Sequence, residues 1–326
     1  MKYLVTGATA FAGCHLTKLL LTEGHTVYAT SRRTNGSETD VLDTLTREEF
    51  DRIHWLFCDF TDKSSCVRVM KADKFDGVFH LGAQSHPPTS FQLPFYTQTV
   101  NVLGSLNLLE ALKDNQPDTR FLFCSTSEVY GAPELKDGER MDESWQIAPV
   151  NPYAASKAAF DLFVCERVRN NFLDGLVTRA FSHTGPKRGR IFSISSDAFQ
   201  IAAIALGKQA PVIHVGNLTS RRVVADVRDV VRAYYLLMTN PALKGVYNVG
   251  GEGVHTMKHY LDEMVDIAGL AGKVTTEIDQ KLWRPIDIPI QVPNTDKLRR
   301  DTGWQPTIPL RQTLSDLLDY WRRKLA

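Results

Sequence analysis

The sequence lacks the cysteine pattern of a disulfide-stabilised or metal-binding protein. Its 326 residues include five cysteines, scattered along the chain without a CxxC spacing or a neighbouring group of histidines. An odd number of scattered thiols is typical of buried cysteines in a reducing compartment. We therefore expect neither disulfides nor a metal site.

An excess of charge of one sign and long hydrophobic runs are also absent. The net charge is +1, so no overall field would attract nucleic acid or an acidic membrane. No apolar run approaches the roughly 20 residues that cross a bilayer. The apolar start at Lys2–Thr6 is interrupted by Gly7 too soon for a signal peptide. These features predict a cytoplasmic protein without nucleic-acid or membrane partners.

What the chain does have is an alternation of strand and helix patterns. Strands are predicted at Lys2–Thr6 and at residues 26–30, 53–57, 76–81, 120–124 and 176–181, with helical periodicity between them. This alternation predicts an α/β fold, a Rossmann-type doubly wound parallel sheet, over residues 1–181. Residues 182–326 predict a smaller mixed α/β lobe that binds substrate and is interleaved with the sheet domain.

The first strand leads into a glycine turn that is typical of dinucleotide sites. Gly7 allows a tight turn, and Gly13 allows the following helix to pack closely on the strand. The N-terminus of that helix could bind a pyrophosphate through its free N–H groups. Ala10 occupies the middle glycine position. A tight turn without a ligand is the alternative.

The ends of the next two strands bear on the choice of cofactor. Arg32 and Arg33 follow the second strand where an acidic residue would bind the ribose of NAD, so a 2′-phosphate, and hence NADP, is favoured over NAD. The alternative is two solvated charges. Asp59 follows the third strand and could accept a hydrogen bond from an adenine amino group, or it could be a turn or helix-cap residue.

Two helices with apolar stripes are predicted at residues 96–112 and 153–170. Asn101 on the first could be a hydrogen-bonded core residue or a ligand. The inward positions predicted by the spacing are Val100, Leu103, Leu106, Leu109 and Leu112 in the first helix and Ala154, Ala158, Leu162 and Val164 in the second.

The second helix carries a tyrosine and a lysine that could form a catalytic base. Tyr153 and Lys157 are separated by four positions and so share one helix face. An ammonium close to the phenol would lower the pKa of Tyr153 toward neutrality, which suits removal of a proton from a sugar hydroxyl. Thr126 and Glu128 follow the fifth strand, at the sheet edge where ligands of open α/β sheets bind. The alternative for the pair alone is two surface residues.

Several motifs together resemble one family. They are Thr6-Gly7 with Phe11 and Gly13, Gly82-Ala83-Gln84-Ser85-His86, Ser125-Thr126-Ser127-Glu128-Val129-Tyr130-Gly131, Tyr153 with Lys157, His183 with Arg188-Gly189, Gly216-Asn217-Leu218, and Arg222 with Arg284-Pro285. In this order they resemble extended short-chain dehydrogenase/reductases acting on nucleotide sugars. The most similar branch holds GDP-mannose 4,6-dehydratases and GDP-4-keto-6-deoxy-mannose reductases, and the resemblance covers nearly the whole chain.

The resemblance implies a role for each matching residue. The implied catalytic residues are Thr126, Glu128, Tyr153 and Lys157. The implied cofactor contacts are Gly7, Ala10, Phe11, Gly13, Arg32, Arg33, Asp59, Phe60, Leu81, Ala83, Ser85, Tyr153, Lys157, His183 and Arg188. The implied substrate contacts are Ser85, Thr126, Ser182, Asn217, Arg222 and Arg284. The chain departs from the family pattern at Ala10, at Ser182, where an asparagine is usual, and at Val223-Val224, where an acidic and an aromatic residue are usual.

Three functions follow from this interpretation. The first is a GDP-sugar 4,6-dehydratase with tightly bound NADP, favoured because Glu128 supplies the second acid/base group that dehydration needs. The second is a GDP-4-keto-6-deoxy-mannose reductase that uses NAD(P)H. The third is a non-catalytic NADP(H) sensor, which the four filled catalytic positions disfavour. The resemblance also implies a homodimer or homotetramer.

Overall fold

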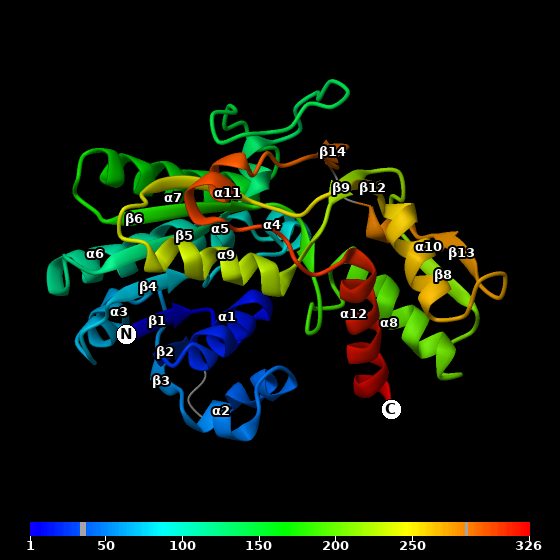
Figure 1. The fold of residues 1–326 in the computed structure, drawn as a ribbon, viewed down its shortest axis with the longest axis horizontal. Helices are drawn as coiled ribbons and strands as arrows, with labels where there is room; N and C mark the ends of the chain where they lie inside the picture. Colours follow the sequence, from blue (N-terminus) through cyan, green and yellow to red (C-terminus); the bar gives the residue numbers. More distant parts are fainter. Residues whose placement is uncertain (33–36, 284–285) are drawn as a thin grey trace.

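The computed structural model describes residues 1–32, 37–283 and 286–326. Seven parallel strands form the main sheet in the order β11-β6-β5-β4-β1-β2-β3, of which β1 to β6 are labelled in Figure 1. These strands are β1 Lys2–Thr6, β2 Thr26–Ser31, β3 His54–Phe57, β4 Gly77–His80, β5 Arg120–Thr126, β6 Gly175–Ala180 and β11 Gly245–Val249. The strand order reverses between β1 and β4, so the crevice at their carboxyl ends is where a ligand would bind.

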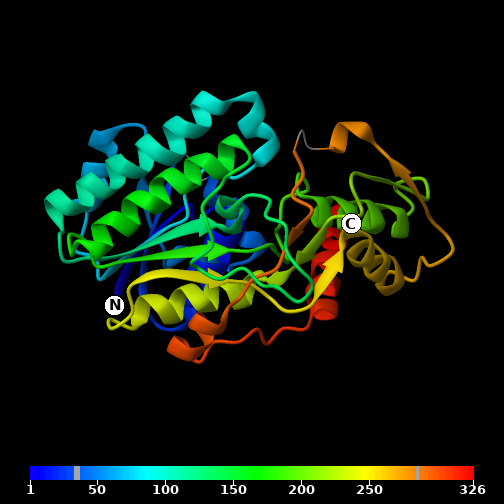
Figure 2. The same cartoon turned by 90° about the horizontal axis from the view of Figure 1, so that it is seen from above.

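Helices cover both faces of this sheet, as predicted for a doubly wound fold (Figure 2). One face packs α1 Phe11–Thr22 and α9 Val227–Thr239 around one apolar cluster, which includes Leu16 and Val230. The other face packs α3 Lys63–Met70, α6 Ser105–Asn115 and α7 Pro152–Arg169 around a second cluster. The seventh strand, β11, and helix α9 both follow residue 182 in the sequence. The strand prediction missed β11, which pairs with β6.

The remaining elements form a smaller mixed lobe beside the sheet. Helices α8 Ser193–Ala205, α10 Met257–Ile267 and α12 Leu310–Leu325 share an apolar core with β8 Val212–Val215. The short strands are β7 His183–Thr184, β9 Arg221–Val223, β10 Ala225–Asp226, β12 Val254–Thr256, β13 Thr275–Ile278 and β14 Ile290–Gln291. The short helices are η1 Ser37–Asp43, α2 Arg47–Asp51, α4 Pro87–Gln92, α5 Pro94–Gln98, η2 Thr99–Gly104, η3 Ser127–Tyr130, η4 Gln280–Leu282 and α11 Asp296–Thr302. The predicted fold class is confirmed.

The helix predicted over residues 96–112 is divided in the structure. It comprises the end of α5, a π-helical stretch η2, and α6. Gly104 ends η2 against the core, since a Cβ there would lie 2.9 Å from the Cβ of Phe60. Leu103 and Leu162 were predicted to point inward, which is wrong: they are 56% and 52% exposed. Each helix does repeat apolar residues at helical spacing, but some of these residues face outward.

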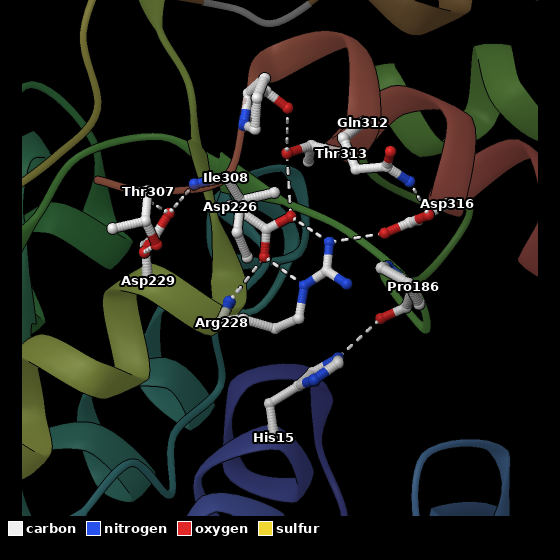
Figure 3. A network of polar contacts seen from close by, with 11 residues as sticks. His15, Pro186, Asp226, Arg228, Asp229, Thr307, Ile308, Gln312, Thr313 and Asp316 are labelled. Carbon is white, nitrogen blue, oxygen red and sulfur yellow. Dashed lines mark hydrogen bonds and ion pairs between the residues drawn. The ribbon is translucent and has the colours of Figure 1, made fainter.

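A partly buried polar network fastens the lobe to the sheet domain (Figure 3). The Asp226 carboxylate accepts hydrogen bonds from Arg228 and from the hydroxyl of Thr313 on α12. Arg228 also donates to Asp316, one turn further along α12. Beside this network, His15 of α1 contacts the carbonyl oxygen of Pro186 at 2.9 Å. The C-terminal helix and the loop after β7 are thereby held against α1 and α9.

Within the described parts of the chain, no helix combines the length and apolarity needed to cross a bilayer. The same residues contain no cluster of three or more His, Cys, Asp or Glu side chains that could hold a metal ion.

Candidate active site

A cavity of about 820 Å³ lies between the carboxyl edge of the sheet and the C-terminal lobe. Its walls come from the turn after β1, the end of β5, the start of α7, the loop before α8, and the segments around β8 and β9. The cavity therefore sits at the reversal in strand order and spans both parts of the chain.

The glycine turn after β1 is as tight as its sequence predicts. Gly7 has a φ of +69°, which favours glycine. A Cβ on Gly13 would lie 2.1 Å from the carbonyl oxygen of Gly7, so only glycine fits at position 13. Ala10 precedes α1 without a side-chain cap, and it lines the cavity. The first N–H groups of α1 thus have no side-chain cap at Ala10 to compete with an anion.

Polar side chains that the sequence interpretation missed hold this turn in place. The Thr6 hydroxyl accepts hydrogen bonds from the N–H groups of Leu81 and Gly82, both at 3.0 Å. Its own hydrogen is then directed to Nδ1 of His80, 2.8 Å away, which leaves the other ring N–H to donate to Ser105. Burial lowers the pKa of His80 to about 3, which keeps the ring neutral. The ends of β1 and β4 are tied together at the crevice.

The four predicted catalytic residues all line this cavity. Thr126 ends β5, and its hydroxyl caps η3 by accepting a hydrogen bond from the N–H of Glu128, which lies in the first turn of η3. Tyr153 and Lys157 come from the first turns of α7. The Glu128 carboxylate accepts a 2.7 Å hydrogen bond from Nδ2 of Asn151, which also caps α7 by accepting from the N–H of Ala154. Asn151 therefore couples the position of the carboxylate to the start of the helix.

The predicted lowering of the Tyr153 pKa is wrong for this structure. Burial, together with the charge of Glu128, raises the pKa of Tyr153 above its ordinary value, against smaller opposing effects of Thr126 and Arg188. Burial also lowers the pKa of Lys157 to about 8. The Lys157 ammonium lies 4.1 Å from the centroid of the Phe123 ring. Their shared helix face does bring the pair into one cavity, but burial is the largest influence on the pKa of each group.

The loop after β7 contributes aromatic and cationic side chains to the cavity wall. The His183 ring stacks on Phe11 at 5.8 Å, and the Arg188 guanidinium lies 3.5 Å from the centroid of the Phe192 ring. Burial and the charge of Arg188 lower the pKa of His183 to about 4. Lys187 donates to the carbonyl oxygen of Thr9 in the glycine turn at 3.0 Å. The loop is thus linked directly to the turn across the cavity.

The structure brings together most, but not all, of the other predicted site residues. Those that line the cavity are Gly7, Ala10, Phe11, Gly13, Leu81, Ala83, Ser85, Ser182, His183, Arg188, Asn217 and Arg222. Asn217 donates to Asp287 at 2.6 Å, and Arg222 contacts the same carboxylate at 3.5 Å. Arg33 and Arg284 lie outside the described residues.

Three predicted cofactor contacts do not line this cavity. Arg32 is exposed at the end of β2 and donates to the Tyr96 hydroxyl at 3.4 Å. Asp59 accepts hydrogen bonds from the backbone and side chain of Thr61, as a turn residue does. Phe60 is 9% exposed and belongs to the core under Gly82, where an added Cβ would lie 2.4 Å from its ring.

Of the two alternatives for Asn101, a hydrogen-bonded core residue or a ligand, the structure shows the core residue. It is 1% exposed, accepts a hydrogen bond from the N–H of Gln84, and donates to Ser156 of α7 at 2.9 Å. Two functional candidates were missed: Asn151 and Asp197. The signal for Asn151 was its place just before Pro152, since asparagine is a preferred N-cap residue. Asp197 interrupts the apolar sequence of α8, and it lines the cavity.

Comparison with known proteins identifies the family of the chain. The family model for GDP-mannose 4,6 dehydratase matches residues 4–317. A GDP-mannose 4,6-dehydratase of Yersinia enterocolitica is 26% identical, over 97% of this chain and 92% of its own length. A GDP-6-deoxy-D-mannose reductase of Pseudomonas aeruginosa is 33% identical, over 77% of this chain and 81% of its own length.

Among solved structures, RMD from Pseudomonas aeruginosa complexed with NADPH is similar throughout. It superposes with a TM-score of 0.80 at 29% identity, covering 99% of this chain and 98% of the other. Because the family model spans nearly the whole sequence, the sheet, the lobe and the cavity between them all fall within the match. The chain belongs to the GDP-mannose 4,6 dehydratase family.

Proposed function

We propose that the protein is a GDP-sugar 4,6-dehydratase, a lyase that converts GDP-mannose or a closely related GDP-hexose or heptose to its 4-keto-6-deoxy form. The observation that carries this proposal is Glu128, held by Asn151 at 2.7 Å in the same cavity as Thr126 and Tyr153. A hydride transfer at one carbon needs only one acid/base group. A second, separately held carboxylate suits the additional loss of water.

NADP is the proposed cofactor, with NAD as the alternative, and the structure offers features that fit a dinucleotide. Gly7 and Gly13 form a cradle that a Cβ would fill. The hydroxyls of Ser125 and Thr184 are buried without a hydrogen-bond partner among the described residues, and both line the cavity. What NADP supplies when bound is a reversible hydride acceptor. The glycine turn and the start of α1 would hold its pyrophosphate, and Arg32 would be placed for the 2′-phosphate.

The chain's own residues divide the proton transfers between two groups. Tyr153 and Thr126 would hydrogen-bond to the oxygen on C4 of the sugar. Tyr153 would remove the O–H proton as the ketone forms. Because burial raises the pKa of Tyr153, the phenol needs positive charge nearby to act as a base, and Lys157 and Arg188 are cations that line the same cavity. The new ketone acidifies the proton on C5. Glu128 takes that proton and returns one to the departing 6-hydroxyl, which leaves as water. The hydride taken from C4 would then return to C6 while C5 regains a proton, which gives the 4-keto-6-deoxy sugar.

Nucleotide-sugar binding is assigned to the lobe side of the cavity. Arg222 and Asn217 lie there around Asp287, and Arg222 would pair with the diphosphate. Ser85 and Ser182 line the region toward the sheet and would contact the sugar. In this proposal residues 1–181 mainly bind the dinucleotide and residues 182–326 mainly bind the nucleotide sugar.

A reductase is the second candidate, favoured by the 33% identity to a GDP-6-deoxy-D-mannose reductase. In that reaction Tyr153 would donate its proton to a 4-ketone as the cofactor is oxidised, and the raised pKa of the buried phenol suits an acid. Two incubations of the purified protein separate the candidates. The dehydratase makes a 4-keto product from GDP-mannose with substoichiometric NADP⁺. The reductase makes none, but consumes NADPH in proportion to an added GDP-4-keto-6-deoxy sugar.

We also propose that the protein is a cytoplasmic homodimer, with a homotetramer as the alternative. Exposed apolar side chains cluster on α5, η2 and α7, which pack together: Phe95, Tyr96, Leu103 and Leu162 are 83%, 41%, 56% and 52% exposed. Apolar surface of this kind marks an interface. Light scattering of the wild type and of Leu103→Glu/Leu162→Glu tests it, because a dimer through these helices should dissociate in the variant.

A further inference from the structure

Asp197 is an unpartnered carboxylate in the wall of the cavity. It lies on α8 in the C-terminal lobe and is 5% exposed. Among the described residues its carboxylate has no hydrogen-bond or ion-pair partner, and burial alone raises the pKa of Asp197 to about 7. A buried carboxylate without a partner is costly, and such groups are normally paired. Its side chain is therefore a candidate acceptor for a ligand.

The other carboxylates of the cavity wall do not share this property. Glu128 accepts a hydrogen bond from Asn151 at 2.7 Å. Asp287 accepts one from Asn217 at 2.6 Å and lies 3.5 Å from Arg222. Both are held by the protein itself. Asp197 is left as the carboxylate whose partner must come from outside the described chain.

The surroundings of Asp197 suit a flat, uncharged group. One helical turn away, Gln200 fixes α8 to β8 by bonding both backbone groups of His214. The cavity wall beyond β8 is formed by Val215, Gly216, Leu218, Met257, Leu282 and Trp283. At Gly216 an added Cβ would lie 3.1 Å from the carbonyl oxygen of Leu282, so the missing side chain lets the segment after β13 approach. A planar ring could pack on these apolar groups within the cavity that Asp197 also lines.

An ionised carboxylate only accepts hydrogen bonds, so its ideal partner presents two neighbouring donors. Guanine does so through N1–H and the 2-amino group. Uracil and thymine present a single N3–H between two carbonyl oxygens, and adenine and cytosine present a ring-nitrogen acceptor beside their amino groups. We propose that Asp197 is the residue that determines specificity for the guanine base, accepting hydrogen bonds from N1–H and the 2-amino group. This rests on the proposed function, in which the substrate is a GDP-sugar.

Calorimetric titration with nucleoside diphosphates tests this assignment. The wild type should bind GDP about 10- to 100-fold more tightly than IDP, which lacks the 2-amino group. Asp197→Asn should weaken GDP by a similar factor and bind XDP at least as well as GDP, because an amide offers one donor and one acceptor to the xanthine edge. UDP binding should not change. Asp262→Asn is the matched control: it removes the same charge from an exposed pair with Lys258 on α10.

The outcomes separate this inference from the proposed function. If the wild type binds GDP and IDP equally, the assignment of Asp197 is overturned, and this comparison needs no variant. It is also overturned if Asp197→Asn binds GDP as the wild type does. In either case a wild-type preference for GDP over UDP would leave the proposed function standing. A wild type that prefers UDP or dTDP would overturn both.

Discussion

Asn151 offers the sharpest test of how the site is built, because its side chain makes two separable contacts. Its Oδ1 caps α7 through the N–H of Ala154 at 2.8 Å, and its Nδ2 donates to Glu128 at 2.7 Å. Asn151→Ser keeps a hydroxyl that can cap the helix but cannot reach Glu128. Asn151→Ala removes both contacts. The pair of variants therefore isolates the contact to the carboxylate.

The two contacts of Asn151 determine how much free energy of unfolding each variant should lose. Removing the cap lowers the free energy of unfolding by about 1 kcal/mol. Losing the hydrogen bond to a charged group lowers it by about 1.5 kcal/mol, the low end of the range, because Glu128 is partly exposed. Denaturant unfolding should therefore show a loss of about 2.5 kcal/mol in Asn151→Ala and about 1.5 kcal/mol in Asn151→Ser.

The effect on catalysis distinguishes positioning from simple destabilisation. Both variants should lower kcat for complete dehydration by about 10- to 100-fold, since a misplaced catalytic group loses that much. Oxidation at C4 relies on Tyr153 and Thr126 and should persist. In a single turnover, reduced cofactor should then accumulate, which its near-ultraviolet absorbance records. Wild-type turnover by Asn151→Ser, or equal slowing of oxidation and dehydration, would refute the role of Asn151.

Three further predictions follow from single contacts. Tyr153→Phe should lower kcat by at least about 100-fold while fluorescence titration shows unchanged NADP binding, and retained turnover would exclude the phenol as acid/base. Asp161→Ala should lower the free energy of unfolding by about 3–5 kcal/mol, because it strands the buried Arg179 guanidinium that pairs with both carboxylate oxygens at 2.8 and 3.0 Å; a loss below 1 kcal/mol would contradict this. Asp197 has a raised pKa in the folded state, so it binds its proton more tightly there and its contribution to stability falls as pH rises from about 4 to about 7. Relative to wild type, Asp197→Asn should therefore gain up to about 4 kcal/mol between those pH values, and unfolding curves that shift in parallel would argue against a buried unpaired carboxylate.

The strand and glycine patterns predicted the sheet domain well because each depends on local sequence. The turn at Gly7 and Gly13 and the edge cluster at Thr126 and Glu128 were found from spacing alone. The strand β11, Gly245–Val249, was missed because it follows the strand and helix alternation of residues 1–181 from which the other six strands were predicted.

Other predictions were wrong where the property depends on the burial of a side chain, which the spacing of residues does not show. The spacing of Tyr153 and Lys157 placed them together correctly, but it could not show that desolvation would raise the pKa of Tyr153. Leu103 has the period of a buried residue and is exposed, because spacing identifies an apolar helix face but does not show what covers it. Phe60 follows a strand end but turns into the core beneath Gly82.

The most direct test of the dehydratase proposal follows one atom. The protein is incubated with GDP-mannose deuterated at C4 and a trace of NADP⁺, and the product is examined by mass spectrometry and NMR. The account predicts a 4-keto-6-deoxy product that carries the deuterium at C6, with no net change in reduced cofactor. Unchanged GDP-mannose, together with NADPH-dependent reduction of a GDP-4-keto-6-deoxy sugar, would contradict it.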